Sequence, residues 1–269
     1  MEFDFRSKAV IITGAGRGIG RAMVKTFHDA GAMIVAADRD ADSLGETCRA
    51  YAERVIPVVR DISIPKGAQA IVDRCVNEFG RVDVCVNNAA VAPHAALLEE
   101  RSEVWDTVYA VNCRGTFLMT QLSARAMIAG GHEGRIINFS SGVSKRGSAG
   151  AAAYASSRAA VESFSRVAAI ELAPHNILVN TVSPGLIDTQ PKPLPPRMAE
   201  GLGKRIPTLP LARPGRPEEV AWVTMFLASE YAGYVCGAVW EVDGAAGIGT
   251  RAGHSIIDDD PRYDWVTKT

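Results

Sequence analysis

The sequence contains few residues that could form a metal site or a disulfide framework. Its five cysteines include no CxxC pair, and its five histidines include no HExxH pattern or other ligand pairing. Three of the cysteines lie within apolar or helical patterns, which favours buried free thiols over disulfides. We therefore predict that the protein binds no metal ion.

The sequence also lacks an excess of either charge and any long hydrophobic run. Lys and Arg total 29 against 30 Asp and Glu, which gives a formal net charge of -1. We expect no nucleic acid and no membrane among its partners, because neither a global basic field nor a polybasic segment is present. The first apolar run follows two acids and is too short for a signal peptide or a membrane span, so we expect a cytoplasmic protein.

What the sequence does contain is a regular alternation of short apolar runs and longer helical segments. The apolar runs, interpreted as strands, are 9–13, 33–37, 55–59, 82–86, 135–139, 177–182 and 239–242. The helical segments are 19–30, 41–52, 66–79, 102–128, 153–172 and 217–228. Most of the runs are continuous, as in parallel strands that are covered on both faces. The pattern predicts an α/β protein with a doubly wound, parallel seven-stranded sheet and helices on both faces, a Rossmann-type fold in a single domain over 1–250.

Two segments interrupt this alternation. Residues 189–215 hold seven of the 14 prolines, and a loop of this length inside a compact domain is usually functional or disordered. Residues 251–269 have no core pattern. This C-terminal tail is either a solvated terminus, which is the commoner case, or an arm that docks on a neighbouring subunit.

A glycine-rich stretch, TGAGRGIG at residues 13–20, follows the first predicted strand and opens the first helix. Gly14, Gly18 and Gly20 permit a tight turn and a close approach of the backbone to a pyrophosphate. The helix N-terminus supplies free N–H groups and the positive end of the helix dipole. A lone glycine-rich turn is often only structural, but its place in the first βαβ unit favours dinucleotide binding.

Acidic residues end the second and third predicted strands. Asp38 lies about where the dinucleotide fingerprint expects a partner for the ribose 2′-hydroxyl, and its carboxylate would repel a 2′-phosphate. NAD is therefore favoured, while the nearby cations Arg17 and Arg39 keep NADP as the alternative. Asp61 is placed to accept a hydrogen bond from the adenine amino group, or else it is a cap or turn acid.

Further motifs follow the glycine turn in a fixed order. They are NNA at Asn87–Ala89, Asn112 in VYAVNCRG, Ser141 in RIINFSSG, Tyr154 thirteen residues later, and SPGLIDT at Ser183–Thr189. Together they resemble the short-chain dehydrogenase/reductase family, in its order and spacing, over about residues 6–248. The resemblance implies an oxidoreductase that transfers a hydride between NAD and a secondary alcohol or ketone, with a homotetramer as the family's usual state.

The chemistry of alcohol oxidation gives these residues roles. The reaction needs a base for the hydroxyl proton and a donor that orients the oxygen. Tyr154 is the candidate base, and Arg158 on the same helix face would lower its pKa from the ordinary value of about 10. By the resemblance, Ser141 would bind the substrate oxygen and Asn112 would help to hold a water for proton relay. Taken singly, the three have structural alternatives: a helix-face aromatic, a cap before a helix and a locally satisfied amide.

The expected cofactor site combines the glycine turn, the strand-end acids and the later motifs. Its residues are Gly14, Arg17, Gly18, Ile19, Gly20, Asp38, Arg39, Asp61, Ile62, Asn88, Tyr154, Arg158, Pro184, Gly185, Ile187 and Thr189. By the resemblance, Pro184 and Gly185 would turn under the nicotinamide, and the Ile187 backbone and Thr189 would bind its carboxamide.

The sequence departs from the family pattern at two positions. Arg158 stands where the family has lysine, and Ala90 stands where NNAG would have glycine. An arginine can support a phenolate and donate to ribose, but it does not release its proton, because its pKa exceeds about 12. We therefore expect a working site with an altered proton relay.

Two other functions are possible for such a sequence. The first is a catalytically impaired dinucleotide-binding protein with a regulatory or redox-sensing role. The second is dehydration or epimerisation, which the intact Asn112, Ser141 and Tyr154 disfavour.

By the same resemblance, residues 189–215 form the substrate lid. Its cations are Lys192, Arg197, Lys204, Arg205 and Arg213. They would suit an anionic or polyhydroxylated substrate, although a solvated loop explains them equally well. The pocket wall residues expected by position are His94, Val143, Lys145, Arg146 and Leu186. Apolar faces of the predicted helices 102–128 and 153–172 would pack against a second subunit.

Overall fold

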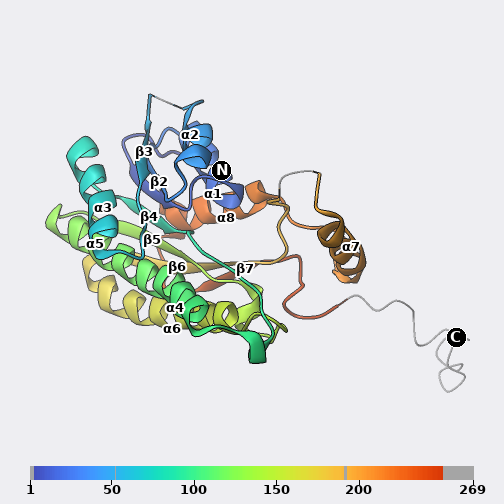
Figure 1. The fold of residues 1–269 in the computed structure, drawn as a ribbon. Coiled ribbons are helices and arrows are strands. Elements are labelled where there is room, and N and C mark those ends of the chain that lie inside the picture. Colours follow the sequence, from blue (N-terminus) through green and yellow to red (C-terminus); the bar gives the residue numbers. More distant parts are fainter. Residues whose placement is uncertain (1–2, 52, 191–192, 251–269) are drawn as a thin grey trace, which may run out of the picture.

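A parallel sheet of seven strands, in the order β3-β2-β1-β4-β5-β6-β7, forms the centre of the protein (Figure 1). The structure is a computed structural model that describes residues 3–51, 53–190 and 193–250. The strands are β1 (Ala9–Thr13), β2 (Met33–Asp38), β3 (Val55–Val59), β4 (Val84–Asn87), β5 (Gly134–Phe139), β6 (Ile177–Pro184) and β7 (Val239–Val242). β1, β4 and β5 are buried along their whole length, which is why they read as continuous apolar runs. The predicted doubly wound, Rossmann-type sheet is confirmed.

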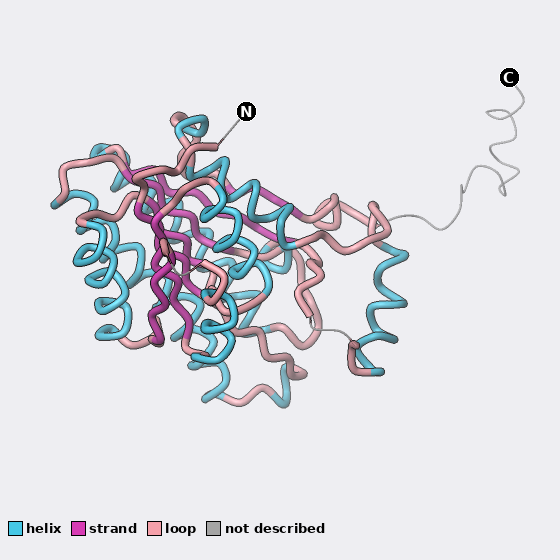
Figure 2. Tube along the Cα trace, turned by 90° about the horizontal axis from the view of Figure 1, so that it is seen from above, coloured by secondary structure: helices cyan, strands magenta, loops and turns pink. Residues whose placement is uncertain are grey.

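Helices cover both faces of the sheet (Figures 1 and 2). They are α1 (Gly18–Asp29), α2 (Ala41–Cys48), α3 (Pro65–Phe79), α4 (Ser102–Tyr109), α5 (Thr116–Ala129), α6 (Ala152–Leu172), α7 (Pro196–Arg205) and α8 (Pro217–Ala228). Single 3-10 turns cover Leu97–Glu99, Gly142–Ser144, Ala173–His175, Ile206–Thr208 and Glu230–Ala232. α1, α2 and α8 pack on one face around one apolar cluster, and α3, α5 and α6 pack on the other face around a second.

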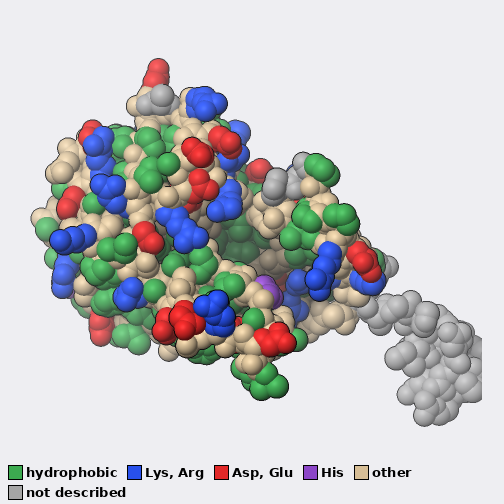
Figure 3. Space-filling model, in the orientation of Figure 1, with side chains coloured by type: hydrophobic (Ala, Val, Ile, Leu, Met, Phe, Trp, Pro, Cys, Tyr) green, Lys and Arg blue, Asp and Glu red, His purple; other side chains and the backbone are tan. Residues whose placement is uncertain are grey.

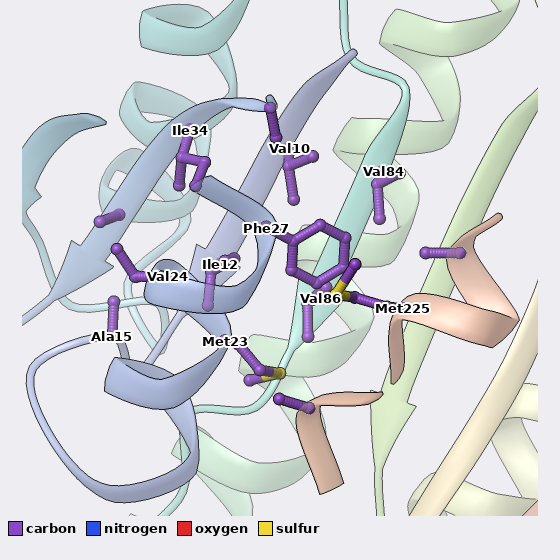
Figure 4. Packing of buried hydrophobic residues seen from close by; sticks show 14 of the residues in the cluster. Val10, Ile12, Ala15, Met23, Val24, Phe27, Ile34, Val84, Val86 and Met225 are labelled. Atoms are coloured by element: carbon purple, nitrogen blue, oxygen red, sulfur yellow. The ribbon is translucent and has the colours of Figure 1, made fainter. Parts of the chain in front are cut away.

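Phe27 lies at the centre of the cluster beneath α1 (Figure 4). Val10 and Val84 from neighbouring strands and Met225 from α8 lie around its ring. The ring is also packed edge-on against Phe5, with 4.9 Å between the ring centroids. This packing holds α1 and α8 together on the sheet and so fixes the start of α1 relative to the strand ends.

The strand order reverses beside β1. β1 pairs with β2 on one side and with β4 on the other, in parallel register. Ligands of open α/β sheets bind outside the carboxyl ends of the strands at such a reversal. The glycine turn after β1 and the segments after β4, β5 and β6 all begin at this edge.

The segment predicted as one helix over 102–128 is not continuous. α4 and α5 are joined by a π-helical turn, Ala110–Gly115, which holds more residues per turn than an α-helix and is frequent at functional sites. Asn112 in this turn is 0% exposed. Gly115 allows the turn to approach Ile62 closely, because a Cβ at Gly115 would lie 2.7 Å from Ile62 Cδ1.

The segment predicted as a loop over 189–215 contains α7 and a 3-10 turn. Pro195 and Pro196 occupy the N-cap and the first position of α7, where the missing N–H of proline costs no hydrogen bond. None of the residues of α7 is buried, and the helix stands apart from the sheet in both views (Figures 1 and 2). α7 is therefore attached to the molecule far less tightly than the helices on the sheet.

The predicted tail, 251–269, and the lid cation Lys192 lie outside the described residues. Within the described part of the chain, no helix combines the length and the apolar character needed to cross a membrane.

Candidate active site at the carboxyl ends of the strands

A cleft along the carboxyl ends of the strands consists of two cavities, of about 820 Å³ and about 740 Å³. They adjoin, because both are lined by Ile19, Asn88, Ala90, Ala92, Thr189 and Gln190. Figure 3 shows the recess between the body of the molecule and the segment that carries α7. Cavities of this size bind small molecules and cofactors in other proteins.

The glycine turn forms part of the lining of the first cavity. Gly14 has φ +65°, and a Cβ there would lie 2.8 Å from Ala89 Cα. A Cβ at Gly20 would lie 1.9 Å from the carbonyl oxygen of Gly14. Both positions therefore require glycine, and the turn can bring its backbone close to a ligand. Gly14, Gly18 and Gly20 all line the first cavity.

Asn88 holds this turn in place. Its Nδ2 donates to the carbonyl oxygens of Thr13 at 3.0 Å and Gly14 at 3.1 Å. Its backbone N–H donates to Thr13 Oγ1 at 3.1 Å. Asn88 lines both cavities, so its hydrogen bonds tie the end of β4 to the turn at the point where the cavities meet. Ala90, the departure from glycine, lines both cavities as well.

Asp38 lines the first cavity beside the glycine turn. Its Oδ2 accepts the backbone N–H of Gly16 at 3.0 Å and its Oδ1 accepts that of Asp40 at 3.1 Å. The carboxylate is thereby fixed beside the glycine turn. The predicted cations Arg17 and Arg39 line the same cavity, as does Arg60, which the sequence interpretation missed.

Asp61 and Ile62 also line the first cavity. Asp61 Oδ1 accepts the backbone N–H of Ser63 at 2.8 Å. Asp61 therefore forms the turn contact that we gave as its structural alternative, and it also lines the cavity.

Three of the predicted reacting residues meet in the second cavity. Ser141, at the end of β5, and Tyr154 and Arg158, on α6, all line it. Arg158 is 3% exposed, and its Nη1 donates to the carbonyl oxygen of Phe139 at 2.7 Å. Its Cζ lies 5.1 Å from the centroid of the Tyr154 ring. Arg158 Nε is buried and has no hydrogen-bond partner among the described residues.

The environment of Tyr154 lowers the pKa of its phenol. Burial alone raises this pKa, because it disfavours the phenolate. The charge of Arg158 and hydrogen bonds from Arg158 and Ser141 act in the opposite direction and outweigh burial, so the pKa falls below its ordinary value. The phenol is therefore prepared to act as a base closer to neutral pH.

Asn112 does not line either cavity. Its Oδ1 accepts the backbone N–H of Val91 at 2.9 Å. Its Nδ2 donates to the Val91 carbonyl oxygen and to Ser157 Oγ, each at 3.0 Å. Both amide hydrogens are used, and Ser157 in turn donates to the carbonyl oxygen of Tyr154 at 2.7 Å. The side chain of Asn112 thus links the wall of the cleft to the start of α6.

Known proteins share this architecture. A family described as "Enoyl-(Acyl carrier protein) reductase" matches residues 14–246. The chain is 39% identical over 241 residues to the 3-oxoacyl-(acyl-carrier-protein) reductase of Thermotoga maritima, which covers 88% of this chain and 96% of the relative. It is 36% identical over 250 residues to a sorbitol dehydrogenase of Cereibacter sphaeroides, with 88% and 96% covered. A crystal structure of a short-chain type dehydrogenase/reductase from Mycobacterium marinum matches with a TM-score of 0.85 at 33% identity, over 91% of this chain and 97% of that one.

The chain belongs to the short-chain dehydrogenase/reductase family. The resemblance drawn from the sequence motifs is thereby confirmed. These relatives are named as oxidoreductases, a reductase and a dehydrogenase, and the chain matches nearly their whole length.

In this short-chain dehydrogenase/reductase, a buried acid that sequence interpretation missed supports the strand end that carries Ser141. Glu162 is 6% exposed. Its Oε1 accepts hydrogen bonds from Ser140 Oγ at 2.6 Å and from Ser144 Oγ at 2.5 Å. The residues on either side of Ser141 are thus anchored to α6, the helix of Tyr154. The sequence could have identified Glu162 by its position, one helical turn after Arg158 on the same face of the helix.

The motif after β6 lies at the second cavity. Pro184, Gly185, Ile187 and Thr189 all line the second cavity. A Cβ at Gly185 would lie 2.7 Å from Asp243 Cα, so the turn after β6 packs directly against the segment after β7.

Of the expected pocket wall residues, only Leu186 lines the second cavity. His94, Val143, Lys145 and Arg146 line neither of the two cavities of the cleft. Lys145 forms an ion pair with Glu241, and Arg146 Nη1 donates to the carbonyl oxygen of Ala246 at 2.6 Å. For Lys145 and Arg146, these contacts with the segment around β7 explain why the two side chains lie outside the cavities. The described residues include no group of three His, Cys, Asp or Glu side chains that could hold a metal ion, and the predicted lack of a metal stays a prediction.

Proposed function

We propose that this protein is an NAD-dependent dehydrogenase/reductase that interconverts a secondary alcohol and its ketone. The observation that carries the proposal is the shared cavity of Ser141, Tyr154 and Arg158, which adjoins the cavity of the glycine turn. A proton-transfer group, an oxygen-binding group and a fixed cation are the protein groups that this chemistry requires.

The residues of the cleft fit a nicotinamide dinucleotide. Gly14 and Gly20 leave no space for a side chain, as expected where a backbone approaches a pyrophosphate. The guanidinium of Arg158 brings a fixed positive charge to the lining of the second cavity, as the nicotinamide ribose side of such a site would require. We assign the adenosine and pyrophosphate side to Gly14, Arg17, Gly18, Ile19, Gly20, Asp38, Arg39, Asp61, Ile62 and Asn88, and the nicotinamide side to Tyr154, Arg158, Pro184, Gly185, Ile187 and Thr189. A bound nicotinamide supplies hydride exchange with the carbinol carbon.

Tyr154 is the proposed base and acid. It would take the proton of the substrate hydroxyl during oxidation and return a proton to the carbonyl oxygen during reduction. The lowered pKa of its phenol, set by Arg158 and Ser141 against the effect of burial, supports this role. Ser141 would donate a hydrogen bond to the same substrate oxygen and stabilise the charge that develops there.

Arg158 and Asn112 have supporting roles in this proposal. Arg158 keeps its proton, so it would stabilise the phenolate electrostatically, and protons would leave Tyr154 through water rather than through Arg158. Asn112 is a positioning residue, since its amide hydrogens are bound to Val91 and Ser157 and it does not line the cleft.

We favour NAD as the cofactor because of Asp38. The carboxylate lies at the edge of the first cavity with both oxygens bound to backbone N–H groups. A 2′-phosphate would meet its negative charge. Arg17, Arg39 and Arg60 line the same cavity and are the residues through which NADP would bind as the alternative.

A homotetramer is the proposed assembly. Helices α4 to α6 carry large apolar side chains that the described chain does not bury: Phe117 is 41% exposed, Val167 is 51% exposed and Ile170 is 76% exposed. Packing against a second copy would remove this surface from water.

Within the subunit we propose a single domain over 1–250, with residues 189–215 as the lid. The cytoplasmic location stays a prediction.

The proposal is tested by adding NAD and a panel of secondary alcohols to the pure protein and following the absorbance of the reduced cofactor. The Tyr154→Phe variant is expected to lower kcat by about 10²–10⁴-fold, with cofactor affinity little changed. Tyr234→Phe, at a fully exposed tyrosine, is the matched control and is expected to keep the activity. An unchanged rate in Tyr154→Phe refutes the assigned base, and cofactor binding without turnover of any substrate favours a binding module instead.

A further inference from the structure

The wall that α7 contributes to the second cavity is apolar. Met198, Leu202 and Ile206 are spaced by four residues and line the cavity together, as residues on one face of a helix do. Leu194, before the helix, and Ala199 and Gly203 within it complete this wall. Met198 is 40% exposed, so the core of the protein does not cover this stripe.

The described charged residues of the same segment do not contribute to the lining of the second cavity. Of the lid cations that the structure describes, none of Arg197, Lys204, Arg205 and Arg213 lines the second cavity. Lys204, on the side of α7 opposite to the stripe, donates to Glu200 at 2.7 Å. Arg213 forms an ion pair with Glu219 at 2.8 Å. These cations suggested an anionic or polyhydroxylated substrate. Such a substrate would meet none of the described lid cations in the lining of the second cavity.

The polar lining residues belong to the opposite wall. They are Asn88, Ser140, Ser141, Tyr154, Arg158, Asp188, Thr189 and Gln190. This wall consists of strand ends, the start of α6 and the turn after β6. The α7 side of the cavity thus offers no polar side chain, whereas the rest of the lining combines these polar groups with apolar residues such as Phe139, Leu186 and Ile187.

Resting on the proposed function, we infer that the substrate is a secondary alcohol or ketone that carries a hydrocarbon group, aliphatic or aromatic. Its oxygen lies against Ser141 and Tyr154, and its hydrocarbon group packs on the stripe of Met198, Leu202 and Ile206. Covering the stripe removes apolar surface from water on both partners. A polyol or sugar in the same place would leave hydroxyl groups against the apolar wall without hydrogen-bond partners, and is a poor substrate.

The inference is tested with reduced cofactor and a series of methyl ketones from butanone to decanone. We expect kcat/KM to rise by about threefold to fourfold for each added methylene until the cavity is filled. Fructose and xylulose serve as polyhydroxylated ketones in the same assay, with the corresponding 3-oxoacyl thioesters as a separate arm that distinguishes a free ketone from one carried on a thioester. Faster turnover of the sugars than of the long ketones, or no dependence on chain length in either arm, would overturn the inference.

Two matched substitutions in α7 test whether the hydrocarbon group of the substrate packs on the apolar stripe. Met198→Gln places an amide on the apolar stripe without changing side-chain length or helix propensity. It is expected to lower kcat/KM for the longest ketone by about 3–10-fold and for butanone much less. Lys204→Gln, on the opposite side of the same helix, is expected to leave the chain-length dependence intact. Equal effects of the two variants would contradict the placement of the hydrocarbon group.

A binding measurement distinguishes a failure of this inference from a failure of the proposed reaction. Decanone is titrated against the complex of the protein with reduced cofactor, and its binding is followed by calorimetry. Binding that Met198→Gln weakens, without turnover, supports the apolar site and refutes the proposed reaction. Faster turnover of the sugars than of the long ketones supports the reaction and refutes the apolar site. The absence of both decanone binding and turnover overturns the inference.

Discussion

The two walls of the second cavity are built in opposite ways. One wall consists of strand ends and α6, where Arg158 is 3% exposed and Glu162 is 6% exposed, and the serines beside Ser141 are hydrogen-bonded to Glu162. The other wall is α7, which has no buried residue and contributes an apolar stripe. The difference indicates a division of roles: groups that move protons need fixed geometry, whereas a surface that covers a hydrocarbon group needs only shape and apolar character.

The largest contrast is expected between the sheet core and α7, in their contribution to stability. Phe27→Ala, in the cluster that anchors α1 to the sheet, is expected to lower the free energy of unfolding by about 3–5 kcal/mol. Leu202→Ala on α7 is expected to lower it by less than about 1 kcal/mol. Urea unfolding followed by circular dichroism measures both. Similar losses would show that α7 is packed as firmly as the sheet helices, and the comparison would fail.

The next effect is expected at Asn112, which ties the fixed wall together. Asn112→Ala removes three hydrogen bonds to Val91 and Ser157 and leaves buried partners unsatisfied, so the free energy of unfolding should fall by about 2–4 kcal/mol. Ser157→Ala, which removes one of these bonds and its bond to Tyr154, should cost less. Activity lost in Asn112→Ala at unchanged stability would contradict a positioning role and point to the water relay instead.

A smaller effect is expected at the other end of the cleft. Asp38→Asn keeps the size of the side chain but removes the charge that a 2′-phosphate would meet. The ratio of kcat/KM for NAD to that for NADP should fall by about 10–100-fold. Asp42→Asn, an exposed acid in the first turn of α2, is the matched control. A ratio that Asp38→Asn leaves unchanged would mean that another group selects the cofactor.

The smallest effect concerns the thiols, which report on burial without affecting function. Burial raises the pKa of Cys48 to about 11 and that of Cys85 to about 12, whereas Cys236 is exposed. Because the thiolate is the reactive form, a disulfide reagent should modify Cys236 rapidly in the native protein, and the buried thiols only after unfolding. The Cys236→Ser variant should lose the rapid phase. Rapid modification that survives this substitution at a residue other than half-buried Cys113 would show that the interior opens.

The sheet and the glycine turn could be predicted because their physical requirements act locally. A strand covered on both faces must be apolar at every position, and a Cβ at Gly20 has no space at all. Ser141 and Tyr154 were found through the motifs that resemble the family, and Arg158 because it lies one helical turn after Tyr154 on the same face.

Other features depend on contacts that no local pattern encodes. The π-helical turn at Ala110–Gly115 has the composition of an ordinary helix, and the contact of its Asn112 with Val91 forms only in the folded protein. The prolines and glycines of 189–215 concealed α7, although Met198, Leu202 and Ile206 have helical spacing. Glu162 was missed because a single acid on a helix is usually solvated, and its serine partners are adjacent only in the folded protein.

The central claim is that the fixed charge of Arg158 keeps the buried phenol of Tyr154 acidic enough to act as the base. The most direct test is the pH dependence of kcat/KM for alcohol oxidation in the native protein, Arg158→Gln and Arg158→Lys. The rate should rise with pH as the phenol ionises, and Arg158→Gln should move this rise to higher pH, because burial then raises the pKa of Tyr154 with no charge to oppose it. Arg158→Lys should retain or exceed the native activity with a shifted pH optimum. A rise at the same pH in the native protein and in Arg158→Gln would contradict the claim.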